Sequence, residues 1–143
     1  MGKSNKETQK KWWDAHKEHR AYWNAQERAR RRSIPICTRE QFFEWYAKNP
    51  PTLCACCGIP QEFLSHFPTH NKLELDRLDA WKDIRNSLGY VTGNMTWLCY
   101  RCNNTKSDTL TLQELLNTNY PHRARQRWIM KVREKGIDVS DYL

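Results

Sequence analysis

The sequence predicts a small α+β domain that is held together by a metal site and flanked by helices at both ends. Three observations lead to this fold class: two Cys-x-x-Cys pairs, two short strand-like segments in the stretch that these pairs bound, and basic helical segments at both ends of the chain. The chain has 143 residues and a mean hydropathy of −0.95. We therefore expect one domain with a thin apolar core that needs help from a metal.

The N-terminal segment, residues 3–32, predicts one long basic helix. It contains no proline, and Trp12, His16 and His19 recur at helical spacing. The helix is expected to end just before Pro35, because the residue that precedes a proline is pushed out of the helical conformation.

The middle of the chain predicts a capped helix followed by a hairpin. Thr38 and Gln41 have the spacing of a capping box, so a helix is expected to begin after Thr38. Residues 72–78 alternate polar and apolar side chains, which is typical of a half-buried strand, and residues 95–99 predict the partner strand. A further helix is expected to begin near Asn103.

Two helices are expected after the hairpin region. Thr111 can cap a short helix over the sequence LQELL, which the segment Asn119–Pro121 is expected to break. A last basic helix is expected from about Arg123 to Lys135, where Gly136 stops it.

Two Cys-x-x-Cys pairs, Cys54/Cys57 and Cys99/Cys102, predict a structural zinc site. Two residues between ligands let both thiolates of a tight turn face one ion, and two such turns complete a tetrahedron. Buried free thiols are the alternative interpretation. Cys56 lies between two of these cysteines and is the one rival ligand.

Positive charge is concentrated at the two ends of the chain. The net charge is +8 for the whole chain, +6 for residues 1–32, −1 for residues 33–120 and +3 for residues 121–143. Basic ends on a neutral body are typical of proteins that bind nucleic acid, whereas two merely solvated helices are the alternative. The cations expected to contact nucleic acid are Lys10, Lys11, Lys17, Arg20, Arg28, Arg30, Arg31, Arg32, Lys106, Arg123, Arg125 and Arg127.

The stretch between the cysteine pairs resembles the HNH endonucleases of the zinc-bearing phage type. The resemblance covers about residues 38–118 and rests on a Cys-x-x-Cys-Gly turn, a strand that carries Asp76, Asn94 before the second strand, and Asn103 directly after the second cysteine pair. It implies a ββα-metal fold, in which two strands and a helix hold one divalent ion.

The resemblance also implies roles for particular residues. Asp76 and Asn103 match the ligands of the catalytic ion, and Asn94 matches the residue that braces the hairpin loop. Carboxylate and amide oxygens are hard ligands, which suits Mg²⁺ or Mn²⁺.

The sequence departs from the family pattern at Arg77, where the family has its general-base histidine. Arginine stays protonated and cannot accept a proton from water, but it can hold a phosphate with two hydrogen bonds. Asp79 is the first candidate for the base, although it could instead only order the hairpin, and His70 and His66 are the next candidates.

The link between the two strands is a second departure. Residues 80–88 are longer than the usual connection, and Trp81, Lys82 and Arg85 could touch DNA at the hairpin tip. A plain insertion explains the length equally well.

These features predict a metal-dependent endonuclease that hydrolyses phosphodiester bonds of double-stranded DNA, of phage or homing-element type. A catalytically inactive zinc-stabilised DNA-binding module and an RNA-binding or RNA-cleaving protein are the alternatives. We expect a basic helical extension over residues 1–34, the nuclease domain over 35–118 and a second basic helical extension over 119–143. The sequence has neither a long apolar run nor a secretory signal, so a cytoplasmic protein without an organic cofactor is expected.

Overall fold

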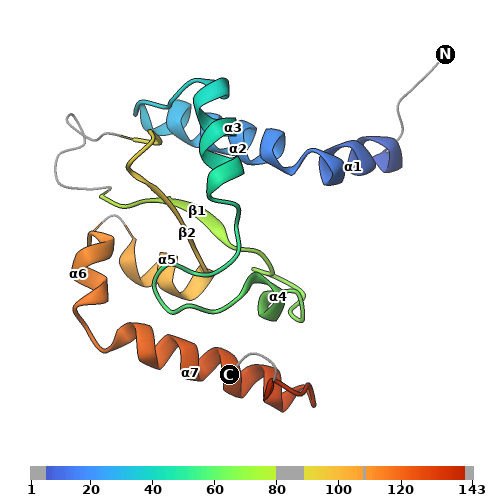
Figure 1. The fold of residues 1–143 in the computed structure, drawn as a ribbon, viewed down its shortest axis with the longest axis vertical. Coiled ribbons are helices and arrows are strands. Elements are labelled where there is room, and N and C mark those ends of the chain that lie inside the picture. Colours follow the sequence, from blue (N-terminus) through green and yellow to red (C-terminus); the bar gives the residue numbers. More distant parts are fainter. Residues whose placement is uncertain (1–5, 80–88, 108, 141–143) are drawn as a thin grey trace.

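A two-stranded antiparallel hairpin lies between two groups of helices in the computed structural model, which describes residues 6–79, 89–107 and 109–140 (Figure 1). Helices α1 to α3 lie on one side of the hairpin, and α5 to α7 lie on the other. This arrangement confirms the α+β fold class. The elements are α1 (Lys6–Ala15), α2 (Lys17–Arg32), α3 (Arg39–Lys48), α4 (Gln61–Leu64), β1 (Glu74–Arg77), β2 (Met95–Leu98), α5 (Tyr100–Lys106), α6 (Leu112–Leu116) and α7 (Tyr120–Glu134).

The hairpin matches the expected strands, although each strand is shorter than expected. Strand β1 pairs with β2 so that Glu74 lies opposite Leu98 and Arg77 lies opposite Met95. The apolar members of both strands are buried, but Asp76 and Arg77 are also buried, with exposed fractions of 9% and 3%. The end of β1 therefore buries two charged side chains, which is costly unless they have partners.

The N-terminal basic segment forms two helices, so the prediction of one continuous helix is wrong. The break falls at His16, whose φ and ψ of −127° and 59° are not helical. The His16 ring donates from Nδ1 to the carbonyl oxygen of Trp12 at 2.8 Å, while its backbone N–H bonds to the carbonyl of Trp13 at 3.1 Å. The side chain thus occupies the acceptor that the backbone would use in an unbroken helix.

Helix α3 begins with the expected capping box. Gln41 donates its backbone N–H to the Thr38 hydroxyl at 3.2 Å, and Thr38 donates its backbone N–H to the Gln41 side chain at 2.9 Å. Behind this cap, Phe42 is fully buried and its ring centroid lies 5.3 Å from that of Tyr22 in α2. The contact joins α2 to α3.

Helix α6 also begins as expected, after a capping box at Thr111, but α7 begins earlier than expected. It starts at Tyr120 rather than near Arg123, because Pro121 lies in its first turn instead of breaking the chain. A proline there sacrifices no helical hydrogen bond.

Both basic ends of the chain contribute to the buried core. Tyr22 and Ala25 of α2 and Trp128 and Ile129 of α7 belong to one cluster of buried residues. Within the described ranges, no helix is long and apolar enough to span a membrane. The expected DNA contacts at the hairpin tip, residues 80–88, lie outside the described residues.

Phe42→Ala should lower the free energy of unfolding by about 3–5 kcal/mol, the range for truncating a fully buried aromatic side chain. The matched control is Met130→Ala, because Met130 is 57% exposed and its truncation should cost less than about 0.5 kcal/mol. Urea denaturation of both variants measures the difference. Equal stabilities would contradict the packing described for α2 and α3.

Candidate functional site

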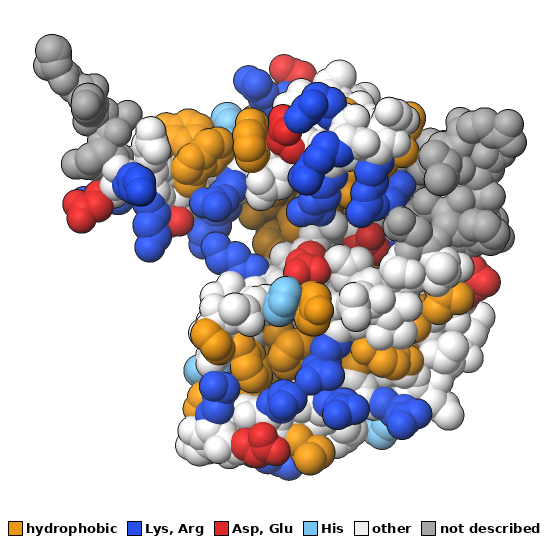
Figure 2. Space-filling model, turned by 180° about the vertical axis from the view of Figure 1, so that it is seen from behind, with side chains coloured by type: hydrophobic (Ala, Val, Ile, Leu, Met, Phe, Trp, Pro, Cys, Tyr) orange, Lys and Arg blue, Asp and Glu red, His pale blue; other side chains and the backbone are white. Residues whose placement is uncertain are grey.

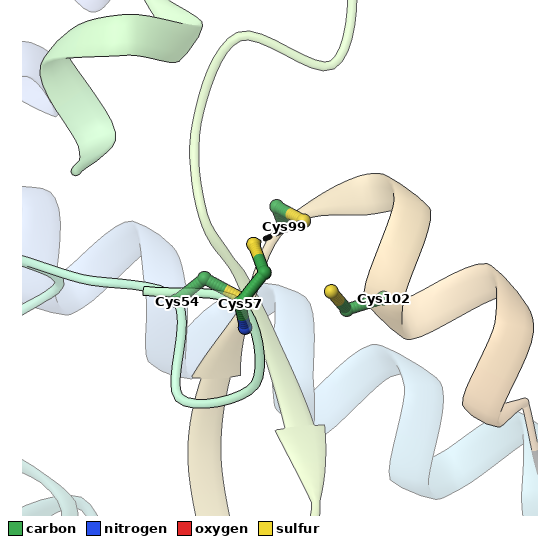
Figure 3. A group of neighbouring side chains, drawn as sticks. All are labelled: Cys54, Cys57, Cys99 and Cys102. Carbon is green, nitrogen blue, oxygen red and sulfur yellow. Dashed lines mark hydrogen bonds between the residues drawn. The ribbon is translucent and has the colours of Figure 1, made fainter. Parts of the chain in front are cut away.

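Four cysteine side chains converge beneath the start of α5 (Figure 3). Cys54 and Cys57 come from the loop before α4, Cys99 follows β2, and Cys102 lies in the first turn of α5. Their Sγ atoms all lie within 4.8 Å of one another, and all four side chains are buried. The expected cluster is therefore present, and the rival Cys56 does not belong to it.

The loop that carries Cys54 and Cys57 is a tight turn. The backbone N–H of Gly58 donates to the carbonyl of Cys54 at 2.9 Å, and Gly58 has a φ of 77°, which favours glycine. N–H groups point at the sulfur atoms: the Trp128 indole donates to Cys99 at 3.2 Å, and the Cys57 backbone donates to Cys54 at 3.5 Å. Both bonds stabilise negative charge on sulfur.

The thiols also affect one another's ionisation. Hydrogen bonds from Cys102, Cys57 and Cys99 lower the pKa of the Cys54 thiol. The pKa of Cys102 is raised, first because of its hydrogen bond to Cys54. One thiolate therefore forms readily, but four thiolates at this distance need a cation. Four buried sulfur donors around one point match the ligand set of structural zinc.

A second group of polar side chains lies between β1 and α5. Glu74 and Asp76 are two residues apart on β1, so their side chains leave the same face of the hairpin. Asn103 donates its amide N–H to Glu74 at 2.9 Å, and the Lys106 ammonium lies 2.9 Å from a carboxylate oxygen of Asp76. Asn103 and Lys106 are three residues apart on α5, which places them on one helical face.

A cavity of about 240 Å³ opens over this group. Glu74, Asp76 and Asn103 line it together with Arg28 and Arg32 of α2. The structure thus brings together the two residues that the resemblance paired, Asp76 and Asn103. Hard oxygen ligands beside two guanidinium groups can hold a divalent cation next to a phosphate.

Two members of this group have places that the sequence did not suggest. Lys106 was expected at the DNA surface, but it is fully buried against Asp76. Glu74 was not a candidate at all. The alternation of side chains along the strand could have indicated Glu74, because it places residue 74 on the same face of β1 as Asp76.

Arg77, Asp79 and His70 are not among the described residues that line the cavity. Arg77 leaves the opposite face of β1, and its guanidinium carbon lies 5.6 Å from the centre of the Tyr90 ring. Asp79 donates its backbone N–H to the side-chain oxygen of Asn94 at 3.0 Å. Asn94 also donates to the carbonyl of Gly89 at 2.9 Å, so its amide joins the two ends of the hairpin link.

His70 lies close to the cavity in an unusual backbone conformation. Its φ is 52°, a left-handed value that is rare for a residue other than glycine. Its ring stacks on Tyr100 with centroids 3.6 Å apart, and its Nδ1 atom lies 3.8 Å from a carboxylate oxygen of Glu74. Tyr100 also lines the cavity. The other histidine candidate, His66, is exposed.

Lys and Arg side chains gather in two bands on one face of the molecule, with acidic and histidine side chains between them (Figure 2). Of the cations expected to contact nucleic acid, Arg28 and Arg125 are half-buried, Lys106 is buried and the others are exposed. Arg28 donates to the carbonyl of Leu75 in β1 at 3.2 Å, which ties α2 to the edge of the cavity. Arg125 donates to the carbonyl of Gly58 at 3.3 Å and so supports the cysteine turn.

Comparison with known proteins supports the fold class. No family model and no curated protein matches the chain. The structure is similar to that of PacI, a rare-cutting HNH restriction endonuclease, with a TM-score of 0.64 and 21% sequence identity. The match covers 80% of this chain and 81% of that chain. The protein therefore has an HNH-like fold, as the resemblance in the sequence implied.

Cys102→Ser should lose the bound metal and lower the melting temperature, because it removes one of four ligands whose binding energy contributes to folding. Cys37→Ser is the matched control, since Cys37 is buried and lies outside the cluster. Metal analysis of the purified variants, followed by thermal melting, tests this. A Cys102→Ser protein with wild-type zinc content and melting temperature would contradict the assignment.

Asp76→Ala should destabilise the protein by about 3–5 kcal/mol, because it leaves the buried Lys106 ammonium without its partner. The double variant Asp76→Ala/Lys106→Met should recover most of that loss, since it removes the buried charge and keeps the volume. Urea denaturation of zinc-loaded protein gives the free energies of this cycle. If Asp76→Ala alone is as stable as the wild type, the ion pair has no structural role.

Proposed function

We propose that this protein is a metal-dependent DNA endonuclease of the HNH type, with one structural zinc ion and one catalytic divalent ion. The observation that carries the proposal is the cavity between β1 and α5, where Asp76 and Asn103 meet on an HNH-like fold. The similar structure belongs to a restriction endonuclease, which supports DNA as the substrate.

The zinc ion is proposed to act as a brace. Cys99 and Cys102 flank the start of α5, the helix that carries Asn103. A zinc ion held by these two thiolates and by those of Cys54 and Cys57 would fix the position of α5 relative to the hairpin. Because Asn103 lies on α5 and Asp76 on β1, the zinc ion would also set the distance between these two side chains.

Asp76 and Asn103 are proposed to hold Mg²⁺ or Mn²⁺, with Glu74 as a further oxygen ligand or as the group that orients the Asn103 amide. When bound, such an ion stabilises the charge that develops on a phosphodiester during hydrolysis. Lys106 keeps the Asp76 carboxylate in place, and Arg28 and Arg32 bind the phosphate at the edge of the cavity.

We assign proton abstraction from water to His70 in preference to Asp79. The His70 ring lies against Tyr100, which lines the cavity, and Glu74 can orient it. Asp79 is tied by its backbone to Asn94 in the hairpin link. Arg77 does not line the cavity but packs against Tyr90, which does, so we assign Arg77 to support of the cavity wall rather than to direct contact with the phosphate.

One observation favours the alternative of an inactive DNA-binding module. The Asp76 carboxylate already has a cationic partner at 2.9 Å, and Lys106 neutralises the charge that a divalent ion would need. In that case the basic side chains would bind DNA and the cavity would hold no catalytic ion.

Cleavage of supercoiled plasmid with Mg²⁺ or Mn²⁺, and loss of cleavage with a chelator that leaves zinc in place, tests the proposal. Asn103→Ala should reduce the rate at least about 100-fold, the scale for losing one group that stabilises the transition state. Asn117→Ala, at an exposed asparagine in the turn before α7, is the control and should cleave like the wild type.

The same assay separates the two candidate bases. His70→Ala should lower the cleavage rate by about 100-fold or more, the scale of general-base catalysis, whereas Asp79→Asn should leave it within a few-fold. The opposite pattern would assign the base to Asp79. A zinc-loaded wild type that binds DNA but cleaves none under any of these conditions would favour the inactive module.

A further inference from the structure

A larger cavity, of about 810 Å³, lies between the segment that precedes β1, helix α5 and helix α7. We name it the α5–α7 groove. It adjoins the catalytic cavity, because Tyr100 and Asn104 line both. Apart from His70, which is proposed as the general base, nothing in the proposed chemistry uses the rest of it. The residues that the argument below uses are Phe67, His70, Tyr100, Arg101, Lys131 and Lys135.

The groove combines aromatic faces with cations. The Arg101 guanidinium lies 5.1 Å from the centre of the Trp128 ring, and the Lys135 ammonium lies 5.3 Å from the centre of the Phe67 ring. Both distances are within the range of cation–π attraction. These contacts hold two cations at the wall of the groove, which suits a ligand with an anionic part.

A flat stacking surface lies at the end of the groove that meets the catalytic cavity. The His70 and Tyr100 rings are nearly parallel, with an interplanar angle of 18° and a centroid distance of 3.6 Å, and Tyr100 is 37% exposed. The left-handed φ of His70 is costly, and such strain persists where the surrounding structure fixes it. The rings are therefore pre-organised before any ligand binds.

The charge of the groove selects an anion. Among the described residues that line the groove, Arg101, Lys131 and Lys135 are cationic and Glu134 alone is acidic. Figure 2 shows a band of Lys and Arg side chains along the lower part of this face, bordering hydrophobic side chains. A nucleotide offers a phosphate and a flat ring together, and an unpaired base has a free face for an aromatic side chain, whereas neighbouring base pairs cover both faces of a base inside a duplex.

We propose that the α5–α7 groove binds an unpaired nucleotide of the DNA strand that leaves the catalytic cavity. Its base stacks on the His70–Tyr100 surface, and its phosphate lies near Lys131 and Lys135. The proposal deepens the proposed nuclease function and rests on it for the position of the scissile phosphate. It adds that the protein holds part of its substrate in single-stranded form.

Equilibrium binding of fluorescein-labelled oligo(dT) to zinc-loaded protein, without Mg²⁺ or Mn²⁺, tests the groove independently of cleavage. Lys131→Ala/Lys135→Ala should weaken binding about tenfold and make its dependence on salt shallower, because two phosphate contacts are lost. Arg133→Ala is the matched control: Arg133 is exposed on the same helix but does not line the groove, and its loss should change binding by less than twofold.

The stacking part of the proposal has its own variants. Tyr100→Ala should weaken oligo(dT) binding about tenfold, the scale of losing one stacked base, while Tyr100→Phe should bind like the wild type. A duplex of the same length should be nearly insensitive to Tyr100→Ala. Zinc content and thermal melting of each variant establish that it is folded.

Three results would overturn the proposal. In the first, Tyr100→Ala weakens the binding of oligo(dT) and of the duplex equally. In the second, Lys131→Ala/Lys135→Ala weakens oligo(dT) binding no more than Arg133→Ala does. The third is tighter binding of oligo(U) with the same variant effects, which would make RNA the occupant. The binding assay does not depend on cleavage. A wild type that fails to cleave in the plasmid assay but shows the expected binding pattern would refute the nuclease function, while the proposed role of the groove would stand.

Discussion

The thiols of Cys54, Cys57, Cys99 and Cys102 bring together two segments that are far apart in the sequence. One segment is the turn before α4, and the other is the junction between β2 and α5. The hairpin has only four residues in each strand, which is too little for independent stability. A metal in this cluster would fix the start of α5 against the hairpin. The spacing between Asp76 on β1 and Asn103 on α5, the proposed ligands of the catalytic ion, would then depend on that metal.

A second set of contacts depends on the first. Once α5 is fixed, Lys106 lies against Asp76, and Asn103 lies against Glu74. The two pairs place two carboxylates and an amide at the floor of one cavity, with arginines from α2 at its edge. The buried ammonium partly balances the carboxylates before any metal binds. Under the proposed function, Asp76 would serve both catalysis and stability, so a loss of activity in an Asp76 variant is informative only beside its unfolding free energy.

The local part of the structure could be predicted from the sequence, because it depends on spacing over a few residues. The capping box at Thr38 and the two strands follow from such patterns, and so does the cysteine cluster. The break at His16 could not be predicted, since a side chain competes there with its own backbone for one acceptor. Glu74 and Lys106 were misjudged because their partners lie on another element, and no pattern within one segment shows which charges a fold will bury.

Anomalous diffraction from crystals of zinc-loaded protein soaked in Mn²⁺, measured on both sides of the zinc absorption edge, tests the central claim most directly. The account predicts two separate ions. Zinc should lie among the four sulfur atoms, and manganese should be in direct contact with oxygen atoms of Asp76 and Asn103, with the Lys106 ammonium displaced from one carboxylate oxygen. An empty cavity with the Asp76–Lys106 pair unchanged, at a Mn²⁺ concentration that supports cleavage, would contradict it.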